Sequence, residues 1–161
     1  MNKKKTTIPE NILQVGWREW ASLPALNIPA IKIKIDTGAK TSALHAFELE
    51  TFSKAGKEYV RFQAHPLQKN NKISIPCELP IFDQRVVKSS NGHKERRITV
   101  ITSIRIGNKE WEIELTLTNR DLMSYRMLLG RQAMQNIAVI PASSFLQGKQ
   151  AKKVVSQSYH Y

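Results

Sequence analysis

A period-two alternation of apolar and polar residues runs through much of the chain and constrains its fold more than any other feature. In the segment 31–35 isoleucines alternate with lysines, and in the segment 111–118 large apolar residues alternate with glutamate and threonine. Successive side chains of a β-strand point to opposite faces, so each segment predicts a strand with one buried and one exposed face. The segment 59–64 is a third, less regular candidate. The chain is therefore expected to be mainly β.

Two turn signals predict how the later strands connect. Gly107-Asn108 lies between the β-branched run 96–106 and the strand expected at 111–118, and Asn91-Gly92 lies between two further runs, 85–90 and 93–100. Asn-Gly flanked by strand-forming residues favours a two-residue hairpin turn. These signals predict a closed, mostly antiparallel β-barrel that carries one long hairpin with a polar tip.

Only one segment, 131–136 after Gly130, is predicted to be helical, and Pro141 prevents it from extending far. The expected architecture is thus a barrel with one short helix near its C-terminal end. The 161 residues suffice for a single domain. We expect this domain at 15–146, between an N-terminal tail at 1–14 and a basic C-terminal tail at 147–161.

The balance of charges is abnormal, with 25 Lys+Arg against 13 Asp+Glu and a formal net charge of +12. Such an excess permits nucleic acid, an anionic membrane surface or an acidic polypeptide as a partner. Six of the basic residues are lysines of the two terminal segments, which we expect to be solvated tails. A second, internal concentration surrounds the predicted hairpin tip. Its members are Arg85, Lys88, Lys94, Arg96 and Arg97.

The single cysteine, Cys77, excludes a disulfide framework within the chain and indicates a reducing compartment. The basic N-terminus is followed by Pro9, Glu10 and Asn11 instead of the apolar core of a signal peptide. No stretch approaches the roughly 20 apolar residues of a membrane span. We therefore expect a cytoplasmic protein without a membrane partner.

The apolar strand at 31–35 runs directly into Asp36-Thr37-Gly38-Ala39. Glycine allows a sharp turn after the carboxylate, and nearby backbone amides can orient the Asp36 side chain. The same residues are also ordinary turn formers at a strand end. A second element, Met127-Leu128-Leu129-Gly130-Arg131, follows about ninety residues later and leads into the predicted helix.

This order of motifs resembles the retropepsin-like aspartic peptidases, in which Asp-Thr-Gly-Ala, a flap hairpin and an apolar-apolar-Gly strand follow one another. The wider phrases 15–20, 40–46, 89–93 and 118–121 are similar to one bacterial branch of that superfamily. Its members are labelled ATP-dependent zinc proteases, or proteases associated with glutamate ligases that modify ribosomal proteins. The resemblance covers about residues 16 to 141.

The resemblance implies an aspartic endopeptidase with Asp36 as its catalytic carboxylate, supported by Thr37 and Gly38. Such enzymes use two carboxylates that share a proton, and this chain has one Asp-Thr-Gly, so it implies a homodimer that joins two Asp36 faces. The methyl side chain of Ala39 cannot hydrogen-bond the carboxylate and therefore does not favour its ionised form. The shared proton should persist to higher pH, so we expect activity at mildly acidic to neutral pH. The substrate-binding residues implied for the flap and cleft are Ala39, Ser89, Ser90, Asn91, Gly92, His93, Leu129 and Gly130.

The basic residues around the flap could select acidic or glutamate-rich polypeptides, or could form a solvated hairpin face. Two other functions stay open, a catalytically silent peptide-binding module and a basic barrel that binds nucleic acid or the ribosome. The segment 47–83 is expected to hold an insertion that retroviral relatives lack and that could block the usual dimer surface.

Neither a metal site nor a nucleotide cofactor is expected. The potential zinc ligands lack the close spacing of zinc sites, and no glycine-rich phosphate loop is present. These ligands are His45, His65, His93, Cys77, Asp83 and His160.

Overall fold

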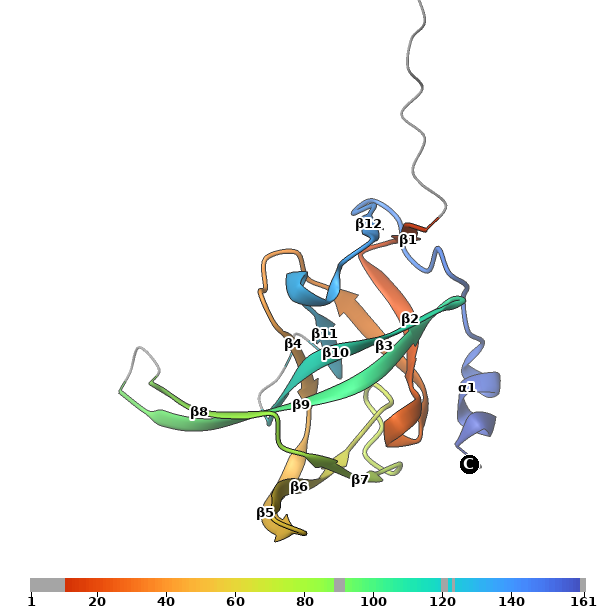
Figure 1. Ribbon diagram of the computed structural model, residues 1–161. Helices are drawn as coiled ribbons and strands as arrows, with labels where there is room; N and C mark the ends of the chain where they lie inside the picture. The colour runs from red at the N-terminus through yellow and green to blue at the C-terminus, as the bar shows by residue number, and fades with distance from the viewer. Residues whose placement is uncertain (1–10, 89–91, 120–121, 123, 160–161) are drawn as a thin grey trace, which may run out of the picture.

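The computed structural model describes residues 11–88, 92–119, 122 and 124–159. Its largest sheet closes on itself, because β10 pairs with both β4 and β9 at the two ends of the strand order β10-β4-β11-β3-β2-β9. Four of the six pairings around this barrel are antiparallel, whereas β4–β10 and β3–β11 are parallel. The predicted closed and mostly antiparallel barrel is therefore confirmed (Figure 1). Its strands are β2 (Arg18–Leu23), β3 (Ile28–Ile35), β4 (Ser42–His45), β9 (Lys94–Ile106), β10 (Lys109–Thr118) and β11 (Met127–Leu129).

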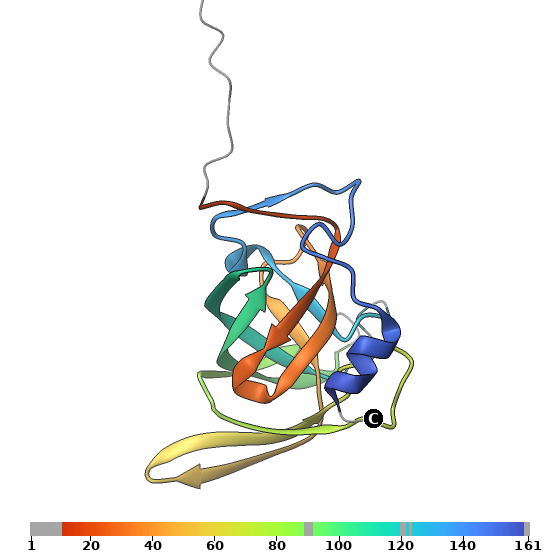
Figure 2. The same cartoon turned by 90° about the vertical axis from the view of Figure 1, so that its right-hand side faces the viewer.

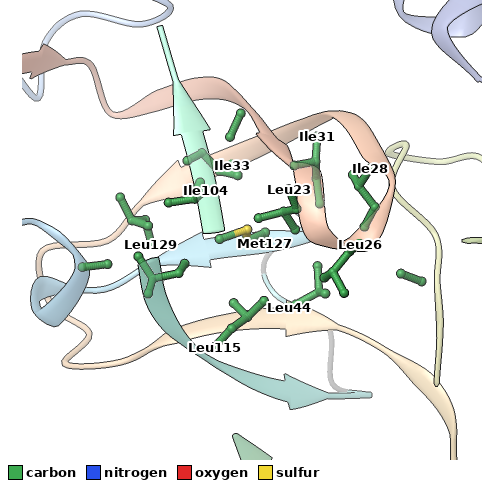
Figure 3. Packing of buried hydrophobic residues seen from close by; sticks show 14 of the residues in the cluster. Leu23, Leu26, Ile28, Ile31, Ile33, Leu44, Ile104, Leu115, Met127 and Leu129 are labelled. Carbon is green, nitrogen blue, oxygen red and sulfur yellow. The ribbon is translucent and has the colours of Figure 1, made fainter. Parts of the chain in front are cut away.

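The period-two pattern of the sequence produces the core. Ile31, Ile33 and Ile35 of β3 are buried, as are Ile113 and Leu115 of β10. The buried faces of the barrel strands meet in one apolar cluster (Figure 3). Each fully buried side chain of this size contributes about 1.5–3 kcal/mol relative to exposure, so the alternation supplies the driving force that closes the barrel.

The long hairpin predicted around Asn91-Gly92 is formed by β8 (Asp83–Lys88) and β9. The shared register begins at Asp83 with Thr99 and ends at Lys88 with Lys94. The hairpin projects from the barrel (Figure 1). Gly92 adopts a left-handed φ of 84°, as an Asn-Gly turn requires, whereas Ser89, Ser90 and Asn91 lie outside the described residues.

The segment 47–83, which is expected to hold an insertion, contains a separate three-stranded sheet of β5 (Phe47–Lys54), β6 (Lys57–Ala64) and β7 (Ile75–Pro80). Phe62 and Cys77 of this sheet belong to the same apolar cluster as the barrel. The sheet is therefore packed onto the barrel and shares its core, and its status as an insertion stays a prediction.

The one short C-terminal helix is confirmed, but its position differs from the prediction. The segment 131–136 forms only a 3-10 turn, η2 (Arg131–Ala133), because the amides of Ala133 and Met134 donate to carbonyls three residues back and Asn136 has a left-handed φ of 59°. The short C-terminal helix is instead α1 (Lys152–Ser158), inside the segment expected to be a solvated tail, where it buries Val155. The remaining elements are η1 (Pro24–Leu26) and the parallel pair β1 (Leu13–Val15) and β12 (Ile137–Val139). None of the described helices is long and apolar enough to cross a membrane.

Candidate active site

Asp36 lies at the end of β3, where the strand leaves the barrel. Its backbone amide donates to the Leu129 carbonyl at 2.9 Å, which continues the pairing of β3 with β11 by one residue. The amide of Gly38 donates to Oδ1 of Asp36 at 3.0 Å, and the amide of Ala39 donates to the Asp36 carbonyl at 3.2 Å. The turn therefore orients the carboxylate, whose residue is half-buried while Thr37 and Gly38 are exposed.

The second sequence element lies directly beneath this loop. The register Leu128↔Lys34 and Leu129↔Ile35 places the end of β11 beside the end of β3. Gly130 donates to Ser42 Oγ at 3.0 Å, and a Cβ atom on Gly130 would come within 2.5 Å of the Thr41 backbone. Only glycine permits this close approach. Two motifs ninety residues apart thus form one supporting structure for the Asp36 loop.

The structure places Leu129 and Gly130 beneath the surface of the chain. Leu129 has no exposed surface and Gly130 is buried, and their implied contact with a substrate stays a prediction. They hold the Asp36 loop from below. Ala39, in contrast, is half-buried at the loop surface, and its carbonyl accepts the Arg131 amide at 2.8 Å.

Arg131 contacts the Asp36 loop, a position that the sequence analysis did not assign to it. Its Nη1 donates to the Thr37 carbonyl at 3.0 Å, so the guanidinium braces the exposed side of the Asp36 loop. Its place in the sequence, directly after Leu128-Leu129-Gly130, could have indicated that it lies close to the Asp36 loop. The Thr37 carbonyl therefore accepts a hydrogen bond from a side chain of its own chain.

The flap residues lie on the β8–β9 hairpin. Gly92 and His93 are exposed, and the other three residues of the expected tip are outside the described part of the chain. The homodimer that joins two Asp36 faces requires a second copy of the chain. The dimer and the substrate contacts of the flap stay predictions.

The candidate zinc ligands are dispersed. Within the described residues, no three His, Cys, Asp or Glu side chains gather closely enough to hold a metal ion. His65 stacks on Phe47 at 4.3 Å between ring centroids, and its Nδ1 lies 3.1 Å from the Ile73 carbonyl. Burial raises the pKa of the Cys77 thiol to about 12, so the thiolate needed for ligation is disfavoured. His65 and Cys77 therefore pack as structural side chains.

Comparison with known proteins supports the family resemblance that the sequence motifs indicate. Residues 14–150 match the RimB-like family, described as retropepsin-like aspartic endopeptidase RimB. A crystal structure of a protein of unknown function from Legionella pneumophila superposes with a TM-score of 0.70 at 32% identity, covering 84% of this chain and 98% of that one.

Curated relatives with high identity carry a different name. The chain is 45% identical over 151 residues to a "Probable alpha-L-glutamate ligase" from Shewanella pealeana, covering 93% of this chain and 33% of the relative. It is 43% identical over 146 residues to a protein of the same name from Desulfotalea psychrophila, covering 90% and 32%. The chain therefore spans about a third of the length of these curated relatives.

Proposed function

Because the chain belongs to the RimB-like family of retropepsin-like aspartic endopeptidases, we propose that it hydrolyses peptide bonds with a dyad of two Asp36 residues from two copies. The observation that carries the proposal is the Asp36 carboxylate directly after the C-terminal end of β3. The Gly38 amide orients it, and β11 and η2 support its loop. One chain supplies one such carboxylate. A twofold dimer supplies the pair that the chemistry needs.

In the proposed reaction the two carboxylates share one proton. The ionised carboxylate removes a proton from a water molecule, whose oxygen attacks the peptide carbonyl carbon while the protonated carboxyl donates a hydrogen bond to the carbonyl oxygen. The carbon–nitrogen bond then breaks, and the dyad returns a proton to the departing nitrogen. The Gly38 amide and the Arg131 brace keep the loop in place, which limits the reorganisation needed for the reaction.

The substitution Asp36→Asn tests the role of the carboxylate, and mixing variant with wild-type chains tests whether two copies are needed. We expect the substitution to lower peptide cleavage about 100- to 10,000-fold, the contribution of acid–base groups, whereas the control Glu112→Gln on exposed β10 should retain it. The mass in solution should correspond to a dimer. When wild-type chains are mixed with an equal amount of Asp36→Asn chains, random pairing should reduce activity to about half. A strictly monomeric active protein, or activity unchanged by mixing, contradicts the proposal.

The proposed substrates are acidic or glutamate-rich polypeptides. The names of the curated relatives link this chain's family to glutamate, and the hairpin carries a matching charge. By the two-residue period, Lys94 and Arg96 lie on the same side of β9 as buried Ile98, the side that continues the barrel interior. Arg85 and Arg97 lie opposite each other on the other side, where each is paired with an acid.

This register divides the basic residues between the two faces of the hairpin, and we expect the face that continues the barrel interior to meet the substrate. The described ion pairs engage Arg85 with Asp83 and Arg97 with Glu95, and none of them includes Lys94 or Arg96. We expect Lys94→Ser with Arg96→Ser to weaken the salt dependence of glutamate-peptide cleavage, and Arg85→Ser with Arg97→Ser, which removes the same charge, to preserve it. Equal effects of the two pairs would show that the field of the whole hairpin, and not its inner face, selects the substrate.

A further inference from the structure

A basic groove lies on the outer surface of the barrel, away from the Asp36 loop. It runs between the loop 66–72 and the C-terminal segment 150–156, and its volume is about 710 Å³. Trp20 of β2 and Lys32 of β3, which are register partners, also line it. Figure 2 shows α1 and the loop that follows β6 at this side of the molecule. The volume falls within the range of about 300–1,000 Å³ that is typical of ligand sites.

The lining of the basic groove is unbalanced in charge. Of its thirteen described lining residues, four are lysines, from three segments of the chain, and none is acidic. Desolvation by burial, together with the nearby charges of Arg18 and Lys152, lowers the pKa of Lys32. Like charges have therefore been brought together without a compensating carboxylate among the described lining residues. The lysines are Lys32, Lys69, Lys72 and Lys152.

We propose that this basic groove is an accessory binding site for an acidic polypeptide segment, separate from the catalytic loop. Carboxylates would neutralise the four ammonium groups, and the amide side chains between them could donate further hydrogen bonds. These amides belong to Gln68, Asn70, Asn71 and Gln150. Asp36 is not among the groove residues, so binding here does not require the proposed hydrolysis.

The aromatic contacts of the basic groove favour a polypeptide over a nucleic acid. Single-stranded nucleic acids bind through bases stacked on aromatic rings as well as through phosphates. Trp20 is already stacked on Phe145, with centroids 6.5 Å apart, and the Lys32 ammonium lies 5.3 Å from the Trp20 centroid. Trp20 is the one aromatic side chain among the described lining residues, against four lysines and four amide side chains. The described groove therefore offers charge and amide donors, but no row of rings on which successive bases could stack.

The test compares two triple substitutions in the full chain, each built on Asp36→Asn so that the probe is not cleaved. The groove variant carries Lys69→Gln, Lys72→Gln and Lys152→Gln. The control variant carries Lys54→Gln, Lys57→Gln and Lys153→Gln, which remove the same charge from exposed positions outside the lining. Fluorescence anisotropy would measure the dissociation constant of a labelled ten-residue glutamate peptide at several salt concentrations. Thermal unfolding would verify that both variants are folded.

The groove variant should raise the dissociation constant about three- to 100-fold, the range for three partly exposed ion pairs, and should flatten its salt dependence. The control variant should change it less than about twofold. Equal effects of the two variants overturn the proposal, as does a larger loss for a labelled oligothymidylate than for the glutamate peptide. If the hairpin pair Lys94→Ser and Arg96→Ser lowers peptide binding and the groove variant does not, the accessory site fails while the proposed peptidase function stands.

Discussion

Glu19 offers a sharp test of what holds the Asp36 end of the barrel together. Its carboxylate has no exposed surface, although it is an acidic residue on the inward face of β2. Oε2 accepts the amides of Gly16 at 2.7 Å and Leu146 at 2.8 Å, and Oε1 accepts the amide of Gln147 at 2.9 Å. One side chain therefore ties the start of the barrel to the C-terminal segment.

These bonds connect to the active-site loop through the backbone. Gly16 precedes Trp17, whose carbonyl accepts the amide of Ile35 at 2.8 Å, and whose amide donates to the Ser143 carbonyl at 2.7 Å. Ile35 is the last residue of β3 before Asp36. Loss of the Glu19 bonds should thus loosen the segment that borders the catalytic carboxylate.

Two opposing effects decide what a substitution of Glu19 does. Removal of a buried charge relieves its desolvation, which can favour an apolar replacement. The three amides, however, would lose bonds to a charged acceptor, each worth about 1.5–3 kcal/mol. The Gly16 amide would in addition stay buried, whereas the amides of Leu146 and Gln147 are part-buried. The second effect should win. We expect Glu19→Met to lower the free energy of unfolding by about 3–6 kcal/mol, a large part of the roughly 5–15 kcal/mol of a typical domain.

Glu19→Gln should be milder. The amide oxygen can still accept two bonds, but its NH₂ group would face the remaining backbone donor, at a cost of about 1–3 kcal/mol. For a chain of this size that is a fall in Tm of roughly 2–12 °C. Urea unfolding followed by tryptophan fluorescence would measure both variants, with exposed Glu114→Gln as a control expected within about 0.5 kcal/mol of the wild type. Hydrogen exchange should show faster exchange at Gly16, Leu146 and Gln147. A Glu19→Met protein as stable as the wild type would refute this reasoning.

Two further predictions concern Cys77, which is 4% exposed and whose thiol has its pKa raised by burial from 9.0 to about 12. Iodoacetamide at pH 8 should modify Cys77 in urea and leave it unmodified in the folded protein, because the nucleophilic thiolate is both disfavoured and covered; modification at equal rates would contradict the burial. The folded chain keeps this proton where the unfolded chain loses it, so the free energy of unfolding should decline as pH rises from about 9 to 12. Chemical unfolding across this range should show a shallower decline for Cys77→Ala.

The strands were predictable because their physical cause is local. The alternation at 31–35 and 111–118 fixes which face is buried whatever the partner strand is. The pairing itself depends on residues far apart in the chain, so the parallel contacts of β3 with β11 and of β4 with β10 could not be derived from alternation. The family resemblance, and not periodicity, brought the Asp36 loop and Gly130 together.

The position of the short helix was predicted wrongly for a physical reason. The segment after Gly130 has helix-compatible residues, yet the amides of Ala133 and Met134 donate to carbonyls three residues back, and Asn136 has a left-handed φ of 59° just before β12. The segment 152–158 is short and basic, and an isolated helix of this length is unstable in water. Burial of Val155 and the bond of Tyr159 to Ala30 anchor it against β3. Tertiary contacts therefore decided the segment 152–158 against its local preference.

Glu19 was missed for a related reason. Its position in β2 alternates with Ala21 and Leu23, so the pattern placed a carboxylate on the buried face, where it is expected to be costly. Only the folded chain shows that two amides of the distant segment 146–147 join the local Gly16 amide at this carboxylate. The sequence feature that could have revealed it is the mismatch itself, a charged residue at an inward position of a strand.

The excess charge shows the same limit most clearly. Lys152 was assigned to a solvated tail because it lies near other lysines at the end of the chain. In the fold it joins Lys32, Lys69 and Lys72, which lie on a barrel strand and a distant loop. Like charges that gather in this way cost energy unless a ligand of opposite charge relieves them. The composition of the chain could suggest an anionic partner, whereas only the fold separates Lys94 and Arg96, on the β9 face of buried Ile98, from a second cluster of lysines around the groove.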